Sequence, residues 1–191
     1  MRRNAATLFV EAFPLQDATM PAVELDSTLQ MQFDALSRIL KDDAVGVRVV
    51  AVHGVCRVLT LYWELIPPAT TKALLATLIK DLAHDAAANT VRVATLVGLK
   101  YLLSQNGSVA VVTMLKGMLT PLATLLNDAS ERVRAALLDL MLTLSKLRTL
   151  TWHAYVKPEG LLARLPLERP ELQVSVFAGL LRPSPAFSDL R

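Results

Sequence analysis

The sequence predicts an all-α fold, a solenoid of about 3.5–4 stacked helical hairpins, and three observations support this prediction. A phrase with a leucine, an aspartate and then Val-Arg returns three times, ending at Arg48, Arg92 and Arg134, which lie 44 and 42 residues apart. Apolar residues between these phrases recur at steps of three and four, as they do on one face of a helix. No segment alternates apolar and polar residues with a period of two, so we expect essentially no sheet.

The spacing of the phrase indicates the kind of solenoid. A period of about 40–47 residues with two helices per unit is typical of HEAT and armadillo repeats. Because such a unit cannot bury its apolar face alone, its copies stack, and we predict a right-handed HEAT-repeat α-solenoid over residues 1–191 as a single segment. Both ends of the sequence are apolar where capping repeats are polar, which favours a piece of a longer array.

The first two hairpins are predicted over residues 26–61 and 67–104. The first begins at residues 27–30, Ser-Thr-Leu-Gln, which fit a capping box. The second begins at Pro67-Pro68, because a proline at the first helical position gives up no backbone hydrogen bond. It ends before Asn106-Gly107, a dipeptide typical of turns.

The third and fourth hairpins are predicted over residues 108–147 and 157–182. In the third, residues 128–131, Asp-Ala-Ser-Glu, fit a second capping box. The fourth is degraded, since Leu172-Gln173 stand where the other hairpins have Val-Arg.

Aspartate and arginine recur at nearly fixed offsets, which predicts a structural ladder between repeats. Six residues separate Asp from Arg in the first and third hairpins and seven in the second, so the second turn should carry one extra residue. We expect each carboxylate to cap the second helix of its hairpin. We expect each arginine to reach the aspartate of the neighbouring repeat through charge-assisted hydrogen bonds. The predicted ladder residues are Asp42, Arg48, Asp85, Arg92, Asp128 and Arg134.

Enzyme chemistry finds little support in this sequence. His53 and Cys56 lie three apart on a predicted helix, but a zinc site needs three or four ligands and the chain has a single cysteine. The sequence has no Gly-x-Ser-x-Gly nucleophile motif and no glycine-rich phosphate loop. We therefore predict neither catalytic residues, nor a metal, nor a cofactor, nor a small-molecule substrate, and place Cys56 in the core.

One cluster of charge favours nucleic acid. The net charge is only +3, yet residues 65–191 hold fourteen basic and nine acidic side chains. Lys146, Arg148 and Lys157 lie beside Trp152, and such basic residues on a hairpin connection can contact a phosphate backbone without reading bases. The alternative is a solvated helix end with Trp152 packed under the next repeat.

Several motifs together resemble a known family. They are Leu8-Phe9 with Ala12-Phe13-Pro14, Tyr62-Trp63-Glu64 with Pro67-Pro68, the phrase from Leu82 to Arg92, and the phrase from Asp128 to Ala135. In this order they resemble the HEAT-repeat G-type subunit of condensin II, over most of the chain from about Leu8 to Leu181.

This resemblance implies a non-enzymatic subunit that acts in mitotic chromosome condensation, in the nucleus and on chromosomes. Its partners would be a kleisin subunit, double-stranded DNA bound without sequence specificity, and, through the complex, the ATPase pair of the structural-maintenance-of-chromosomes type; no membrane is implied. Two alternatives remain open. One is a cytosolic HEAT scaffold, such as a phosphatase regulatory subunit or a transport adaptor, and the other is an enzyme with a helical accessory array.

Overall fold

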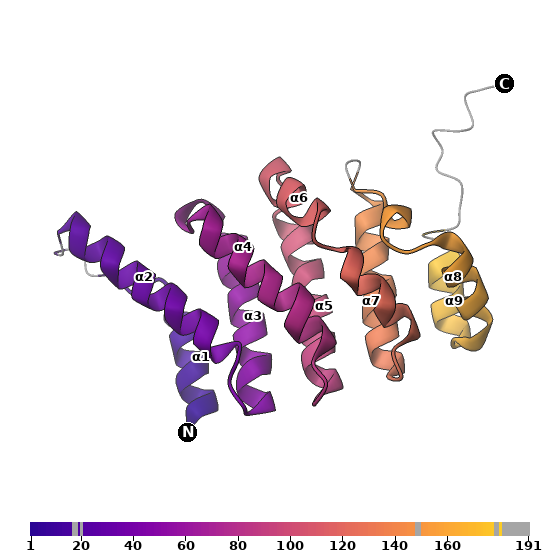
Figure 1. Cartoon of the computed structure of the whole chain (residues 1–191), viewed down its shortest axis with the longest axis horizontal. Helices are drawn as coiled ribbons and strands as arrows, with labels where there is room; N and C mark the ends of the chain where they lie inside the picture. The colour runs from indigo at the N-terminus through magenta and orange to yellow at the C-terminus, as the bar shows by residue number, and fades with distance from the viewer. Residues whose placement is uncertain (17–18, 20, 148–149, 178–179, 181–191) are drawn as a thin grey trace.

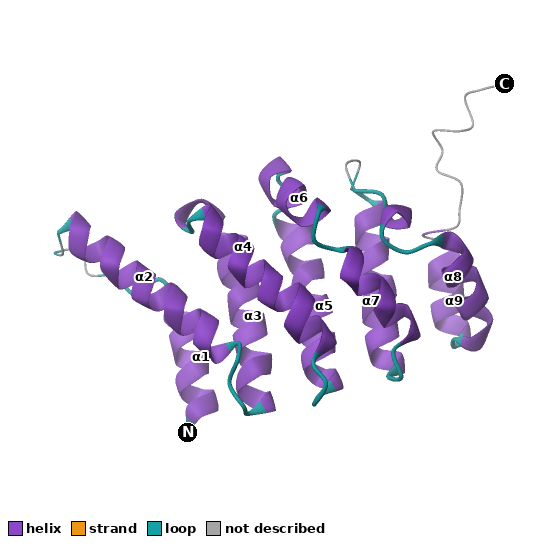
Figure 2. Cartoon of the chain, in the orientation of Figure 1, coloured by secondary structure: helices purple, strands orange, loops and turns teal. Residues whose placement is uncertain are grey.

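The structure is a computed structural model, which describes residues 1–16, 19, 21–147, 150–177 and 180. These residues form an elongated stack of helices, with the N-terminus at one end (Figure 1). Within these ranges no strand is present, so the prediction of an all-α fold is confirmed (Figure 2).

The helices lie in two layers. The first helices of the hairpins form one layer: α2 (Ala22–Ile39), α4 (Pro68–Ala76), α6 (Val109–Lys116) and α8 (Pro158–Arg164). The second helices stand side by side in the other: α1 (Arg2–Ala12), α3 (Val45–Leu61), α5 (Asn89–Gln105), α7 (Glu131–Ser145) and α9 (Pro170–Val176). The chain thus alternates between layers, as a HEAT solenoid does.

Short π-helical and 3-10 segments complete the first layer. Helix α4 runs on through a π-helical turn and a 3-10 turn, η2 (Thr77–Asp81) and η3 (Leu82–His84), and α6 is followed by a separate 3-10 helix, η4 (Thr120–Asn127). The axes of α6 and η4 meet at 68°. Single 3-10 turns precede α4 and α8 and follow α8: η1 (Trp63–Leu65), η5 (Trp152–Ala154) and η6 (Leu165–Leu167).

The position of each residue in its helix explains the recurring Val-Arg pair. The valine is the third residue of α3, α5 and α7 and is buried in all three, at Val47, Val91 and Val133. The third, eighth, eleventh and fourteenth residues of these helices are all buried, which is the spacing of one apolar face. The arginine that follows the valine lies at the edge of this face, where its head group can leave the core.

Two glycines let the second helices approach closely. Gly54 and Gly98 are each the tenth residue of their helix, and a Cβ added there would overlap Val10 of α1 and Cys56 of α3 respectively. In α7 the tenth residue is Leu140, which is fully buried. The close packing of α1, α3 and α5 therefore depends on glycine at the tenth helix position, whereas in α7 a large side chain fills the same position.

The structure confirms the predicted helix limits around the second hairpin. Pro68 is the first residue of α4, and α5 ends at Gln105, directly before Asn106-Gly107. No single helix in the described ranges is long and apolar enough to cross a membrane; only the bent pair of α6 and η4 meets the length and composition criteria, and only jointly.

The two predicted capping boxes are wrong. Helix α2 already begins at Ala22, after Pro21, so Ser27 lies inside it and its hydroxyl donates to the Glu24 carbonyl instead of accepting from a free N–H. In the second box Asp128 lies two residues before Ser130, the residue that precedes α7, and Glu131 is the first residue of the helix, so neither stands at its capping position. Glu131 forms an ion pair with Arg169 at 2.8 Å.

Candidate functional site

The predicted aspartates and arginines meet between repeats. Each arginine is the fourth residue of its helix, on the first turn of α3, α5 or α7. Arg48 Nε donates to Asp85 Oδ2 at 2.8 Å, and only 10% and 8% of these two side chains are exposed. Arg92 Nε lies 3.0 Å from Asp128 Oδ2, and Arg92 Nη2 donates to the other oxygen at 3.2 Å. Arg48 and Arg92 thus each reach the aspartate of the following repeat.

The same arginines also bind their own turn. In each case Nη1 donates to the backbone carbonyl of the aspartate in the arginine's own hairpin: Arg48 to Asp42 at 2.8 Å, Arg92 to Asp85 at 2.6 Å and Arg134 to Asp128 at 2.8 Å. One planar guanidinium therefore joins two successive turns, because its donors lie in a rigid fork. The turns of the ladder follow one another along the lower edge of the stack in Figure 1.

The aspartates hold the turns but do not cap the helices as predicted. Asp42 Oδ1 accepts from Ala44 N, and Asp128 Oδ1 accepts from Ser130 N, in both cases at 2.8 Å. Ala44 and Ser130 are themselves the residues that precede the helix, so each aspartate lies two residues before the capping position and does not serve the free N–H groups inside the helix. Asp85 accepts from two N–H groups, since its turn carries the one extra residue that the spacing predicts.

Glu168 supplies a further rung that the sequence reasoning missed. Its carboxylate accepts from Arg134 Nε at 2.5 Å and from Arg134 Nη2 at 3.0 Å, and Arg164 Nε approaches the same group at 3.0 Å. Only 1% of the Glu168 side chain is exposed. The hydrogen bond from Arg134 lowers the pKa of Glu168, burial opposes this shift, and Arg164 lowers the pKa further.

Gln173 marks where the charged ladder changes. It is the fourth residue of α9, the place of the arginines, and its Nε2 donates to the Glu168 carbonyl at 2.8 Å. The glutamine thus repeats the bond to its own turn but brings no charge. Glu168 lies five residues before Gln173, close to the six or seven residues between aspartate and arginine in the other hairpins, and this near match is the signal that could have identified it.

Arg2 of α1 supplies the first rung. Its Nη1 lies 3.3 Å from Asp42 Oδ2, but 67% of the Arg2 side chain is exposed. Val10 lies eight residues after Arg2, just as Cys56 lies eight residues after Arg48, and both meet a glycine of the next second helix. Arg2 is therefore the counterpart of Arg48, and α1 lies in the layer of the second helices.

The predicted DNA contacts lie around the connection between α7 and α8. Lys146 directly follows α7, Lys157 directly precedes α8, and both are exposed. Arg148 lies outside the described residues. Two nearby basic residues are engaged elsewhere, Arg164 with Glu168 and Arg169 with Glu131.

The aromatic residues of this connection face the core. Trp152 and Tyr155 are buried, and burial raises the pKa of Tyr155. The Tyr155 hydroxyl donates to the Lys116 carbonyl at 3.2 Å, which brings the end of α6 beside this loop and adds exposed Lys116 to the neighbourhood of Lys157. The burial of Trp152 agrees with the alternative given above, and of the three aromatic rings in this connection only that of His153 is exposed.

His53 and Cys56 lie in different environments. His53 is exposed, whereas Cys56 is buried against Gly98, and burial raises the pKa of its thiol to about 12. A thiol that stays protonated is a poor metal ligand. In the parts of the chain that the structure describes, no three His, Cys, Asp or Glu side chains are grouped to hold a metal ion.

Comparisons with known proteins identify the fold family. The family model described as GCN1-like, C-terminal HEAT repeats matches residues 5–148. The chain belongs to the HEAT-repeat family. No solved structure matches it significantly.

Curated relatives agree with the resemblance drawn from the motifs. The chain is 38% identical over 168 residues to condensin-2 complex subunit G2 of Xenopus laevis and 36% identical over 165 residues to that of Homo sapiens. It is 36% identical over 168 residues to that of Danio rerio. These alignments cover 86–88% of this chain but only 14% of each relative. These alignments confirm the resemblance to a G-type condensin II subunit. The chain spans about one seventh of the length of these relatives.

Proposed function

We propose that this chain is a HEAT-repeat segment of a G-type condensin II subunit and serves as a non-enzymatic scaffold in mitotic chromosome condensation. The observation that carries the proposal is 34–38% identity to condensin-2 complex subunit G2 in four vertebrates, over 86–88% of the chain. A stack of hairpins joined by buried ion pairs suits this role, because it offers a long rigid surface.

The proposed protein partner is the kleisin subunit, bound along the exposed face of the second helices. Position nine of these helices points away from the buried face and carries His53, Val97 and Asp139, with exposed Tyr101 one turn beyond Val97. An extended kleisin segment crossing α3, α5 and α7 would meet these side chains in turn. Through the kleisin the segment would join the ATPase pair of the structural-maintenance-of-chromosomes type, in the nucleus.

Affinity purification of the full-length subunit from mitotic extract, read by mass spectrometry, tests membership of the complex. The proposal expects the kleisin and both chromosome-organising ATPases. Recovery of a phosphatase catalytic subunit or of transport machinery in their place would overturn it and establish the cytosolic scaffold instead.

The proposed DNA contacts are the backbone-binding residues Lys146, Arg148 and Lys157. The two described lysines are exposed and flank one connection, and phosphate contacts of this kind need no fixed base geometry. Each neutralised phosphate releases counterions, so affinity should fall steeply with salt.

Charge reversal at this connection tests the DNA contacts. Glutamate at all three positions, in the purified subunit–kleisin pair, should weaken duplex binding about tenfold or more and lower the salt slope by roughly 2–3. A control with Lys41, Lys72 and Lys80 changed to glutamate alters the net charge equally on other exposed surfaces. Equal losses in both variants would assign the effect to overall charge and not to this connection.

A further inference from the structure

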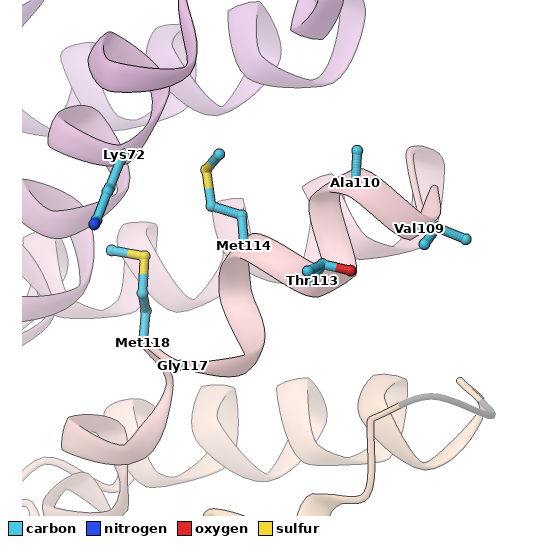
Figure 3. A pocket seen from close by; sticks show the side chains of 7 residues that line it. All are labelled: Lys72, Val109, Ala110, Thr113, Met114, Gly117 and Met118. Atoms are coloured by element: carbon cyan, nitrogen blue, oxygen red, sulfur yellow. The ribbon is translucent and has the colours of Figure 1, made fainter.

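A groove opens in the layer of first helices, between α4 and α6. Its volume is about 820 Å³, and it is lined by Lys72, Val109, Ala110, Thr113, Met114, Gly117 and Met118 (Figure 3). This layer lies across the stack from the second helices, to which the proposed kleisin contacts belong. The groove is therefore a surface that the proposed function leaves unused.

The backbone of the third hairpin creates this groove. Helix α6 ends at Lys116 after eight residues, and η4 continues at 68° to it. Gly117 lies at the break, and a Cβ added to it would have no atom within 4 Å. Pro121, at the start of η4, lacks the N–H that a continuing α-helix would need. In the second hairpin, by contrast, α4 passes into η2 and η3 with no interruption.

The lining is apolar with one cationic edge. Met114 and Met118 point into the space between the two helices, and the Lys72 side chain extends into the same space from α4 (Figure 3). Methionine suits a surface that adapts to a partner, because its side chain is flexible and polarizable. Val109, at the far end of the groove, is 78% exposed. Met114 and Met118 are only partly buried against the core, so part of each side chain remains open to a partner.

The charges around the groove define what it would accept. Residues 68–84 and 109–127 of this layer carry Lys72, Lys80 and Lys116 but a single acidic residue, Asp81. Lys116 adjoins the groove at Gly117, and no acidic side chain lines it. A partner with acidic residues beside its apolar ones is complementary to this arrangement.

The occupant should also satisfy its own backbone. The lining belongs to α4, to α6 and to the turn after α6, and it contains no strand edge with which an extended segment could pair. An amphipathic helix needs no such edge and inserts apolar side chains at i, i+3, i+4 and i+7. Helix α6 has eight residues, about 12 Å at 1.5 Å per residue, so the contact spans about two turns.

We propose that the groove between α4 and α6 binds an amphipathic helix of another protein, with apolar anchors against Met114 and Met118 and acidic residues facing Lys72. None of the residues that line the groove is among the proposed DNA contacts. It lets the scaffold recruit a second protein on the layer opposite the kleisin.

Selection from a peptide library on the intact 191-residue chain tests this proposal. The library consists of displayed peptides of about 16 residues with apolar residues at helical spacing and Asp, Glu, Lys, Ser or Ala elsewhere. The proposal expects enrichment of acidic sequences. No enrichment above an unrelated protein, or enrichment of lysine-rich sequences, would overturn it.

Matched variants then locate the binding site of a selected peptide. Lys72→Glu should weaken the peptide about tenfold, whereas Lys80→Glu, which makes the same charge change outside the groove, should leave it within about twofold. Met114→Glu with Met118→Glu should abolish binding while the thermal melt shows a folded chain. Equal effects of the two lysine variants would overturn the proposal. So would a dimer of the free chain in sedimentation that the methionine variant dissociates, because the occupant would then be a second copy.

Discussion

The two ends of the stack hold their second helices together by different means. From α1 to α5, Gly54 and Gly98 allow the helices to approach closely, and the acids of the ladder are aspartates. From α7 to α9, Leu140 fills the position of the glycines, and the acid is the longer Glu168, bound by two arginines. The repeat therefore preserves the link between successive turns, and not the identity of the residues that make it.

The first rung is also far more exposed than the others. The exposed fraction of the arginine side chain is 67% for Arg2, 10% for Arg48, 16% for Arg92 and 9% for Arg134. Exposed ion pairs contribute little because water screens them, whereas removal of one partner from a buried pair leaves a desolvated charge. We therefore expect that breaking the first rung costs less than breaking any of the three later ones, and that the last rung, with its buried Glu168, costs the most.

The largest effect is expected at Glu168. Alanine there leaves Arg134 and Arg164 without a carboxylate, which should lower the free energy of unfolding of the last hairpin by about 3–5 kcal/mol. Hydrogen exchange should show α8 and α9 losing protection while α3 keeps its own. Glu159→Ala, at an exposed position of α8, is the control and should change little.

Gly54→Ala should be the next most damaging change. Alanine favours a helix more than glycine does, but its methyl group would overlap Val10, and we expect a net loss of about 1–3 kcal/mol in urea unfolding. Gly117→Ala serves as the control, because an added Cβ there meets nothing within 4 Å. Equal stability of the two variants would contradict the close approach of α1 and α3.

Acid should loosen the end that contains Glu168 first. Its pKa is lowered in the folded chain by Arg134, so the unfolded state binds more protons below a pH of about 4.5. The resulting stability is fully present above that pH and is lost as the pH falls through the folded value. In Glu168→Gln, hydrogen exchange of α8 and α9 should depend less on pH between about 5 and 3. An unchanged dependence would assign the acid sensitivity to other carboxyl groups.

The smallest effect is expected at the first rung. Arg2→Ala removes an exposed partner of Asp42, and the carboxylate still accepts from Ala44 N, so the free energy of unfolding should fall by about 0–1 kcal/mol. Thermal melts at low and high salt provide the measurement. A loss above about 2 kcal/mol would show that exposure does not grade the ladder.

The sequence revealed the parts of this structure that repeat. The Val-Arg pair occupies the same two helix positions in α3, α5 and α7. The regular spacing of Asp42, Asp85 and Asp128 before these pairs was therefore enough to predict the ladder. The sequence did not predict the rungs of Arg2 and Glu168. A single Arg in α1 and a Glu–Gln pair do not match the repeated motif, although Arg2 and Glu168 form the same kind of ion pair between turns.

Other features depend on contacts that no spacing encodes. The bend after α6 arises where Gly117 and Pro121 lie close together in the sequence. The groove beside the bend also depends on the position of α4, which supplies Lys72 to its lining. Trp152 and Tyr155 are buried because the connection folds back on α6, so aromatic residues next to lysines did not mean an aromatic surface.

A double-mutant cycle on Arg48 and Asp85 tests most directly the central claim that buried charge pairs between successive turns hold the repeats together. The account predicts a coupling energy of about 1.5–3 kcal/mol for this pair and below about 0.5 kcal/mol for Arg2 and Asp42 in the same urea titration. Couplings of equal size at both rungs would contradict it.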